Sequence, residues 1–524
     1  MKRHFRTVAG RPARPAILLL FPFAAAAALA LTAAPATAQP AGASGPFEAA
    51  LREARISNDD VRDFYRARSF RPLWVAGGRL GPEADALLRL IETAEADGLD
   101  SDDYRPRALA EAVGEARSGA PEALARAEVL LSRRFAQYVR NVRRPRDSSG
   151  MEYAERTLAP VRPTMRAVLD EAAAAPALLG HLENAGWMHP IYGGLRRALS
   201  VLPRGDAADI RVPLGPLLRP GASGERVRLL RRRLGLDGDG DYDARLVQAV
   251  RDFQAAQGLP RDGVAGPLTL AALNRSSADV RRILRLNLDR ARALPADPGR
   301  RYVLVDAAAA RLYVYENGRV RDTMRVVVGR VTDPTPMIAG LIRFATLNPY
   351  WNVPPDLAAT RVAPHAVRGG PAYLRAAGYE VLSDWTASAR IVDPATVDWA
   401  GVAAGRQEVR MRQRPGPENA MGRIKLSFPN RYGVYLHDTP DRDLLRETAR
   451  TFSAGCVRVE DAPRLARWLF GRNLSTRSRT PEQHFVVPEP VPVYITYLTA
   501  APEGDTIAFR EDVYGRDGAR QAAN

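Results

Sequence analysis

The chain has 524 residues, too many for one compact core, so we expect about three domains. Its formal net charge is +17, and nearly all of its positively charged side chains are arginines. Such a charge favours binding to nucleic acid, to an anionic membrane surface or to another acidic polymer. No nucleic-acid-binding motif accompanies this charge, so we expect no nucleic-acid partner. The single cysteine, Cys456, excludes an internal disulfide.

The first 38 residues have the pattern of a secretory signal peptide. Residues 1–14 are basic, residues 16–34 are apolar, and Ala36-Thr37-Ala38 is a small-residue cleavage site. We therefore predict a signal peptide over residues 1–38 and an exported mature chain. Because the apolar run is long enough to span a bilayer, an uncleaved inner-membrane anchor is the alternative.

Residues 46–208 are predicted to form a helical scaffold domain. Apolar residues recur on one side of a helix over residues 121–142, and a similar one-sided pattern covers residues 83–96. A further pair of helices is predicted over residues 163–181. No catalytic motif occurs in this region, which we interpret as structural support.

Residues 221–274 favour a compact module of three helices. The first covers residues 225–234, Asp243 is placed to cap the second, and the third covers residues 268–274. The turn Gly258-Leu-Pro-Arg-Asp-Gly-Val-Ala-Gly-Pro267 precedes the third helix. Together, helices and turn resemble a peptidoglycan-binding module. The alternative is a generic helical bundle that orients the neighbouring domains.

Residues 300–500 are predicted to be mainly β-structure. Asn317-Gly318, flanked by alternating apolar residues, indicates a two-residue hairpin. A strand over residues 342–347 ends at Asn-Pro-Tyr-Trp, where Trp351 is equally suited to anchor the core or to contact a substrate. Strands resume at residues 424–428 and close the domain after residue 491.

A helix-and-loop insertion over residues 356–421 interrupts this sheet. Pro354-Pro355 and Pro415-Gly416 bound it. Long insertions of this kind are more often functional or mobile than part of a core. We interpret the segment as a lid over a catalytic cleft, and an inert surface loop is the alternative.

The stretch from Gly433 to Glu460 contains the candidate catalytic residues. A thiol attacks as thiolate, and an imidazole can accept its proton near neutral pH, so Cys456 and His437 are a candidate nucleophile and base. Alternation over residues 433–437 predicts a strand with the His437 ring at the surface of a cleft. Gly455 lets the backbone approach a substrate, and the N–H groups beside it suit an oxyanion. The alternative for Cys456 is a buried small apolar residue.

His437, followed 19 residues later by Cys456 within Ser-Ala-Gly-Cys-Val-Arg, resembles the active-site signature of the L,D-transpeptidases, the YkuD catalytic fold. The form of the motif and the length of the chain resemble the large periplasmic YcbB-like branch. Ala454 departs from the second histidine of many members, but that position acts chiefly through its backbone. The fold class implied is multidomain α+β: a helical scaffold, a three-helix peptidoglycan-binding module and a mainly-β catalytic domain with a lid.

The resemblance also implies the reaction and the compartment, the periplasm of a Gram-negative bacterium. Cys456 would attack the amide between the diamino acid at position three of a peptidoglycan stem and D-Ala at position four, and His437 would protonate the departing D-Ala. Transfer to a second stem gives a 3→3 cross-link. Water would give L,D-carboxypeptidase activity, and an amine on an outer-membrane protein would give covalent attachment to the wall. Acylation of Cys456 by a carbapenem is also implied.

Five further residues are predicted to form the oxyanion or substrate-binding part of the site: Gly455, Ser453, Arg458, Tyr435 and Trp351. Arg458 is equally suited to hold a substrate carboxylate or to brace the turn, and Ser453 to bond within the turn or assist the site. The expected partners are stem peptides, glycan strands and other cell-wall synthesis proteins, with no cofactor. No HExxH pattern occurs, which disfavours a metal peptidase, and a wall-binding protein without catalysis is the non-enzyme alternative.

Overall fold

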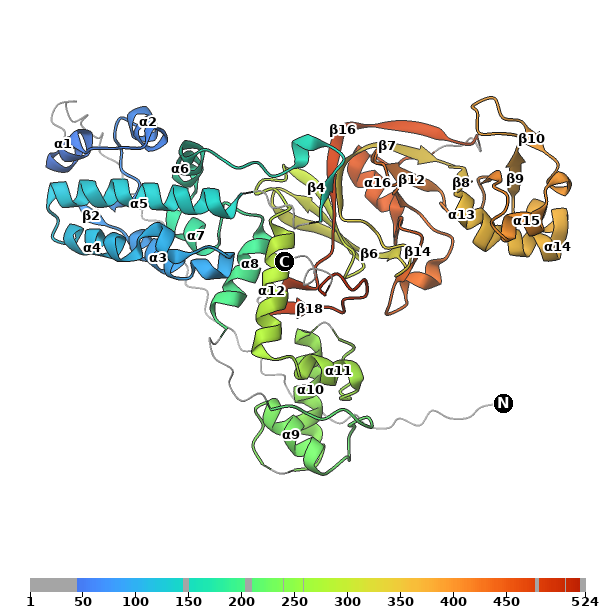
Figure 1. The fold of residues 1–524 in the computed structure, drawn as a ribbon, viewed down its shortest axis with the longest axis horizontal. Helices are drawn as coiled ribbons and strands as arrows, with labels where there is room; N and C mark the ends of the chain where they lie inside the picture. Colours follow the sequence, from blue (N-terminus) through green and yellow to red (C-terminus); the bar gives the residue numbers. More distant parts are fainter. Residues whose placement is uncertain are drawn as a thin grey trace, which may run out of the picture. The chain divides into compact units, whose positions relative to one another are not determined.

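The computed structural model (Figure 1) describes residues 45–144, 150–202, 210–238, 240–257, 259–475, 480–504 and 506–518. The predicted signal peptide at residues 1–38 lies outside these ranges. No helix within them is both long enough and apolar enough to cross a membrane.

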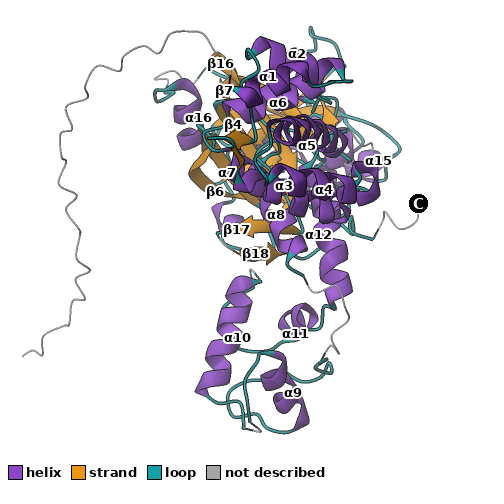
Figure 2. Ribbon diagram, turned by 90° about the vertical axis from the view of Figure 1, so that its left-hand side faces the viewer, coloured by secondary structure: helices purple, strands orange, loops and turns teal. Residues whose placement is uncertain are grey.

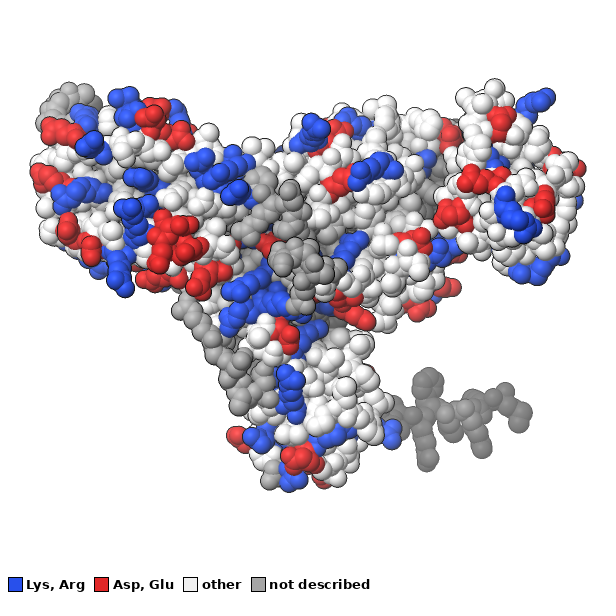
Figure 3. All heavy atoms as spheres, viewed as in Figure 1, with Lys and Arg blue, Asp and Glu red and all other residues white. Residues whose placement is uncertain are grey.

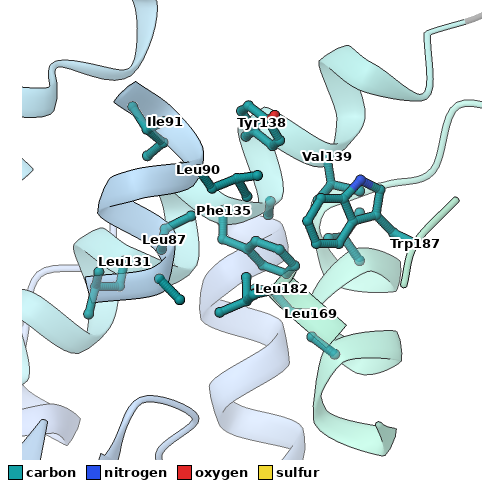
Figure 4. Close-up of a cluster of buried hydrophobic side chains, with 14 of the residues drawn as sticks. Leu87, Leu90, Ile91, Leu131, Phe135, Tyr138, Val139, Leu169, Leu182 and Trp187 are labelled. Atoms are coloured by element: carbon teal, nitrogen blue, oxygen red, sulfur yellow. The ribbon is translucent and has the colours of Figure 1, made fainter. Parts of the chain in front are cut away.

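Residues 46–200 form the predicted helical region. Its helices and strands are α1 (Pro46–Glu53), α2 (Asp59–Ala67), β1 (Val75–Ala76), β2 (Arg79–Leu80), α3 (Pro82–Glu92), η1 (Ala94–Asp97), η2 (Ser101–Tyr104), α4 (Pro106–Ala116), α5 (Pro121–Val142), β3 (Glu152–Tyr153), η4 (Arg156–Leu158), α6 (Met165–Ala174), α7 (Leu178–Glu183) and α8 (Pro190–Ser200). The apolar side of α5 faces the core, where Phe135 packs edge-to-face on Trp187 (Figure 4). Phe135 also packs edge-to-face on Trp74. The pattern over residues 121–142 therefore predicted this helix correctly. Arginine and acidic side chains are interspersed on the visible surface of the region (Figure 3).

The predicted three-helix module consists of α9 (Glu225–Arg233), α10 (Ala244–Ala256) and α11 (Pro267–Leu273), joined by loops (Figure 2). Asp243 caps α10 by accepting a hydrogen bond from the Leu246 N–H at 2.8 Å, as predicted. The Gln254 amide holds the turn before α11, because it donates to Asp262 and accepts from the Gly263 N–H. Helix α12 (Ser277–Ala291) then leads into the β-domain.

The β-domain is built on one large sheet. Its strands are β4 (Arg301–Asp306), β5 (Arg311–Glu316), β6 (Arg319–Gly329), β7 (Ile338–Leu347), β12 (Ile424–Ser427), β13 (Leu436–His437), β14 (Thr451–Ser453), β15 (Val457–Val459) and β16 (Gln483–Thr496), followed by the hairpin of β17 (Ala500–Glu503) and β18 (Thr506–Phe509). The order is β12-β13-β15-β6-β5-β4-β16-β7-β3, and β7 also pairs with β12, so the strand path closes on itself. Helix α16 (Ala462–Phe470) packs on the shared core. Asn317 and Gly318 both have positive φ, which confirms the predicted hairpin.

The insertion contains more β-structure than we predicted. Its elements are β8 (Trp351–Val353), α13 (Pro355–Leu357), the π-helical η5 (Ala358–Val362), α14 (Ala363–Ala376), β9 (Tyr379–Leu382), β10 (Ile391–Val392), η6 (Pro394–Thr396), α15 (Trp399–Ala403) and β11 (Arg410–Gln413), and the sheet order is β10-β9-β11-β8. The predicted helices are present as α14 and α15, but the prediction missed the sheet, since the Arg/Pro-rich sequence of residues 410–416 suggested a loop where β11 forms. In the fold its Met411 and Gln413 are buried while its arginines face outward. A buried cluster of its own, including Leu374, Val381 and Met411, holds the insertion together.

Candidate active site

The site is built on one face of three adjacent short strands. The register pairs His437 of β13 with Lys425 of β12 on one side and with Arg458 of β15 on the other. Paired residues share a face of a sheet, and successive residues alternate between faces. Lys425, His437 and Arg458 therefore share a face with Tyr435 and Cys456. The opposite face is apolar core: Leu426, Leu436, Val457 and Val459.

The strand before His437 is shorter than predicted. Gly433 has a φ of +63° and lies in a turn, so β13 contains only Leu436 and His437. The Asn430 side chain maintains this turn by accepting hydrogen bonds from the N–H groups of Tyr432 and Val434. These side-chain bonds replace ladder bonds that a longer strand would make. The predicted alternation is nevertheless confirmed, since Val434 and Leu436 are buried in the core.

His437 is buried rather than exposed at a cleft surface, which corrects our prediction. Only 4% of the residue is accessible, and its Nδ1 lies 2.6 Å from the Asp438 carbonyl oxygen. The Nδ1–H donates to that carbonyl, and the backbone of Met421 makes a second hydrogen bond with the ring. Burial, with the nearby charge of Arg458, lowers the pKa of His437 to about 3. The imidazole is therefore neutral across the physiological range.

Cys456 lies directly before β15, beside Tyr435. The Val457 N–H donates to the Tyr435 carbonyl at 2.9 Å, which holds the two segments together, and the Cys456 Sγ lies 3.7 Å from the Gly433 oxygen. Burial raises the pKa of the Cys456 thiol, while a backbone hydrogen bond from Tyr435 and the charges of Arg458 and Lys425 oppose the increase. In the resting site, thiol and imidazole are both neutral, and the cations favour the thiolate once the proton leaves.

The turn before Cys456 is held from inside the protein. Gly455 has a φ of +101°, a conformation that side-chain-bearing residues rarely adopt. Its carbonyl accepts a hydrogen bond from the Thr335 hydroxyl at 2.9 Å, and that hydroxyl accepts one from the Gly329 N–H at 2.8 Å. Thr335 is fully buried. Because the C=O and N–H of a trans peptide point in opposite directions, the Cys456 N–H faces away from Thr335.

The Cys456 N–H makes no hydrogen bond within the described part of the chain, so it can donate to another group. Ser453 bonds within the turn, since its hydroxyl donates to the Cys456 carbonyl. Of the two roles open to Ser453, the structure supports the bond within the turn.

Carboxylates near the site are engaged with arginines. Arg458 pairs with Asp441 at 2.8 Å, so it braces the loop that follows His437. The buried Asp438 accepts from the Arg423 N–H at 2.9 Å and pairs with Arg442 at 2.6 Å. These contacts fix the segments on both sides of the imidazole.

A hydrogen bond joins the insertion to the segment of the catalytic turn. Arg361 of η5 donates to the Phe452 carbonyl at 3.5 Å, one residue before Ser453. Trp351 lies elsewhere, on β8, with its ring 6.4 Å from that of Tyr379 in the insertion. The structure thus assigns Trp351 to the packing of the insertion.

Sequence reasoning predicted Cys456, His437, Tyr435 and Arg458, which the register brings together on one face, and Gly455, which lies in the turn before Cys456. It missed Thr335, Asp438 and Lys425. Asp438 follows His437 directly and precedes Arg442 by four residues, which is a readable signal, whereas Thr335 is 120 residues from Gly455 in sequence. Within the described ranges, no group of three or more His, Cys, Asp and Glu side chains is placed to hold a metal ion.

Comparisons with known proteins agree with this geometry. Residues 300–493 match the L,D-transpeptidase catalytic domain, YkuD; residues 223–273 match a peptidoglycan binding domain; and residues 59–199 match a scaffold domain. A Haemophilus influenzae protein named as a candidate L,D-transpeptidase is 30% identical over 241 residues, which cover 45% of this chain and 48% of that protein. The N-acetylmuramoyl-L-alanine amidase CwlL of Bacillus licheniformis is 40% identical over 67 residues, 11% of this chain and 19% of the amidase. The chain thus spans about half or less of these relatives.

A solved L,D-transpeptidase fragment (residues 123–326) from Xylanimonas cellulosilytica is 21% identical, with a TM-score of 0.20, and the match covers 54% of this chain and 99% of the fragment. That score is too low to support an argument. The closed sheet and the match of residues 300–493 agree on the class of this domain. The chain carries a YkuD-type L,D-transpeptidase catalytic domain and a peptidoglycan-binding domain.

Replacing Thr335 tests whether the buried hydroxyl sets the catalytic turn. Thr335→Val removes the donor to Gly455 and leaves the buried Gly329 N–H unpaired, so we expect a loss of about 1–3 kcal/mol in the free energy of unfolding. We also expect at least tenfold slower acylation of Cys456 by a carbapenem. Denaturant unfolding and intact-mass kinetics measure the two effects. Thr335→Ser is the control and should restore both, and a destabilised Val variant with wild-type acylation would contradict the positioning role.

Proposed function

We propose that this protein is a peptidoglycan L,D-transpeptidase that forms 3→3 cross-links through a cysteine acyl-enzyme. The observation that carries the proposal is the shared face of Cys456 and His437, with Nδ1 of the imidazole bonded to the Asp438 carbonyl. The family match of residues 300–493 supplies the substrate class. An exported enzyme of this kind works in the periplasm, where the wall is built.

The first half-reaction transfers an acyl group to sulfur. Nε2 of His437 takes the thiol proton while Sγ attacks the carbonyl carbon of the diamino acid, and the carbonyl oxygen becomes an oxyanion. The Cys456 N–H, turned outward by the bond between Thr335 and Gly455, donates to that oxyanion. The intermediate collapses when the C–N bond breaks and the imidazolium gives its proton to the leaving D-Ala amine. A thioester on Cys456 remains.

The second half-reaction reverses the proton movements. The side-chain amine of another stem attacks the thioester, its proton passes to His437, and the C–S bond breaks to give the new amide and the thiol. The burial that holds the pKa of His437 at about 3 disfavours a lone imidazolium. The charged imidazole is therefore formed only transiently, beside thiolate or oxyanion.

Cys456→Ser tests the proposed nucleophile. Serine lacks the accessible anionic state of a thiol beside histidine, so we expect no cross-linked dimer from disaccharide-tetrapeptide substrates, as followed by mass spectrometry. His437→Gln should remain folded and lose on the order of a hundredfold or more in rate. Unchanged unfolding curves control for stability. Cross-linking by the folded serine variant would remove Cys456 from the mechanism.

We also propose that the α9–α11 module binds glycan strands. Its match to a peptidoglycan binding domain and the turn held by Gln254 support this role. Such a module raises the local concentration of substrate and takes no part in bond making.

Deleting residues 221–274 tests the module. Binding to isolated sacculi, measured by co-sedimentation, should fall by tenfold or more, while turnover of a small soluble tetrapeptide changes less than threefold, because only the insoluble substrate gains from tethering. Thermal unfolding of the shortened protein controls for folding. Equal losses in the two assays would indicate a supporting role instead.

The insertion is proposed to act as a lid that favours an amine acceptor over water. Its contact with the catalytic turn, between Arg361 and Phe452, supports this role, and lid closure commonly excludes water from a reaction. Carboxypeptidase activity is then the expected default when the lid is lost.

Replacing residues 356–421 with a short Gly/Ser linker tests the lid. We expect carbapenem acylation of Cys456 to survive within about threefold, the cross-linked product to fall at least tenfold, and the hydrolysed tripeptide to rise. Intact-mass kinetics and chromatography of the products measure these rates, after circular dichroism has confirmed folding. Wild-type rates in both assays would show that the insertion is not a lid.

A further inference from the structure

Lys425 is an unusual residue in this chain. It is one of only two lysines among 524 residues, the other being Lys2, so every other basic side chain between residues 46 and 518 is arginine or histidine. The one lysine of the described residues lies in β12, directly opposite His437 in the register. It is half-buried on the face that carries the catalytic pair.

The ammonium of Lys425 lies over the ring of Tyr435, the residue beside Cys456. Its Nζ lies 4.9 Å from the centre of the Tyr435 ring, and Tyr435 is the neighbour of Cys456 across the pairing of β13 with β15. An ammonium over an aromatic face is held by the ring quadrupole. Burial is the main influence on the pKa of Cys456 and raises it. The positive charge of Lys425 is one of the influences that lower this pKa, because a nearby cation stabilises the thiolate.

Lys425 differs from the other cations of the site in its partners. Arg458 pairs with Asp441, and Arg442 pairs with Asp438. Among the described residues, no Asp or Glu oxygen lies within 4.0 Å of the Lys425 ammonium. Its neighbours across the strands are His437 and Thr346, both uncharged in the resting site. A half-buried cation without a counter-ion is costly, and an incoming anion removes that cost.

We infer that Lys425 binds a carboxylate of the donor stem peptide beside the scissile amide, an inference that rests on the proposed function. Two donor groups share this chemistry: the terminal carboxylate of D-Ala and the side-chain carboxylate of a carboxylated diamino acid. The compact ammonium, with three rotatable donors over the Tyr435 ring, receives one carboxylate oxygen. An arginine here would instead present a wider planar fork, which is suited to bidentate contact with both carboxylate oxygens.

The test couples variants of the protein to variants of the substrate. Lys425→Met keeps the aliphatic stem and removes the charge, Lys425→Arg keeps the charge, and the exposed Arg321→Met is the control for loss of one positive charge. The tetrapeptide donor is used in three forms: unmodified, with the D-Ala carboxylate amidated, and with the diamino-acid carboxylate amidated. kcat and KM for donor turnover are measured for each combination. The rate of Cys456 alkylation by uncharged iodoacetamide is followed against pH.

Loss of a charge-assisted hydrogen bond corresponds to about a 10- to 100-fold rise in KM, which we expect for Lys425→Met with the unmodified donor. The wild type should lose the same factor when the recognised carboxylate is amidated, and the Met variant should then be indifferent to that amidation. The amide that shows this coupling identifies which carboxylate Lys425 binds. Lys425→Arg should recover part of the loss, and Arg321→Met should match the wild type.

Two results would overturn the inference and assign Lys425 to thiol activation. One is that the effects on KM of Lys425→Met and of either amidation are simply additive. The other is that Lys425→Met changes the pH profile of alkylation and leaves KM unchanged. If the wild type turns over no donor in any form, the proposed function fails instead. The two failures are distinguished by the wild-type rate with the unmodified donor.

Discussion

The parallel pairing of β13 with β15 is the constraint on which the site depends. The two strands contain only two and three residues, so they contribute few ladder hydrogen bonds of their own. They are held because β12 and β6 pair on their outer edges, and because Leu436, Val457 and Val459 are buried beneath them. A slip of one residue would move His437 into the core and Leu436 onto the reactive face. Core packing therefore sets the catalytic geometry.

Charged side chains surround the neutral thiol of Cys456 and the neutral imidazole of His437 on this face. The acids nearest the imidazole, Asp438 and Asp441, are each tied to an arginine and to the loops that they brace. Burial, with the charge of Arg458, keeps the pKa of His437 at about 3. The cations Arg458 and Lys425 instead favour negative charge on Cys456. The same two cations disfavour a positive charge on His437.

The catalytic turn depends on groups that are distant in sequence. Thr335 joins Gly455 to Gly329, and the C-terminal segment supports the same region, since Tyr514 donates to the Gly329 carbonyl at 2.6 Å and Arg516 to the Thr335 carbonyl at 3.0 Å. These bonds lie behind the turn, away from the substrate side. A rigid support of this kind keeps the Cys456 N–H in place without reorganisation during the reaction.

The sequence by itself determined the features that depend only on residues close together in the chain. The periodicity of residues 121–142, the Asn317-Gly318 turn and the Asp243 cap each depend on neighbours within a few residues, and the structure bears them out. The motif around Cys456 is equally local, and the family match agrees with it. The tertiary structure decided the rest. Asn430 shortened the strand before His437, burial of Met411 and Gln413 made a strand from an arginine-rich segment, and the register placed Lys425 beside His437. Those outcomes depend on contacts between segments far apart in the chain, and no local pattern encodes which strand becomes a neighbour or which face is buried.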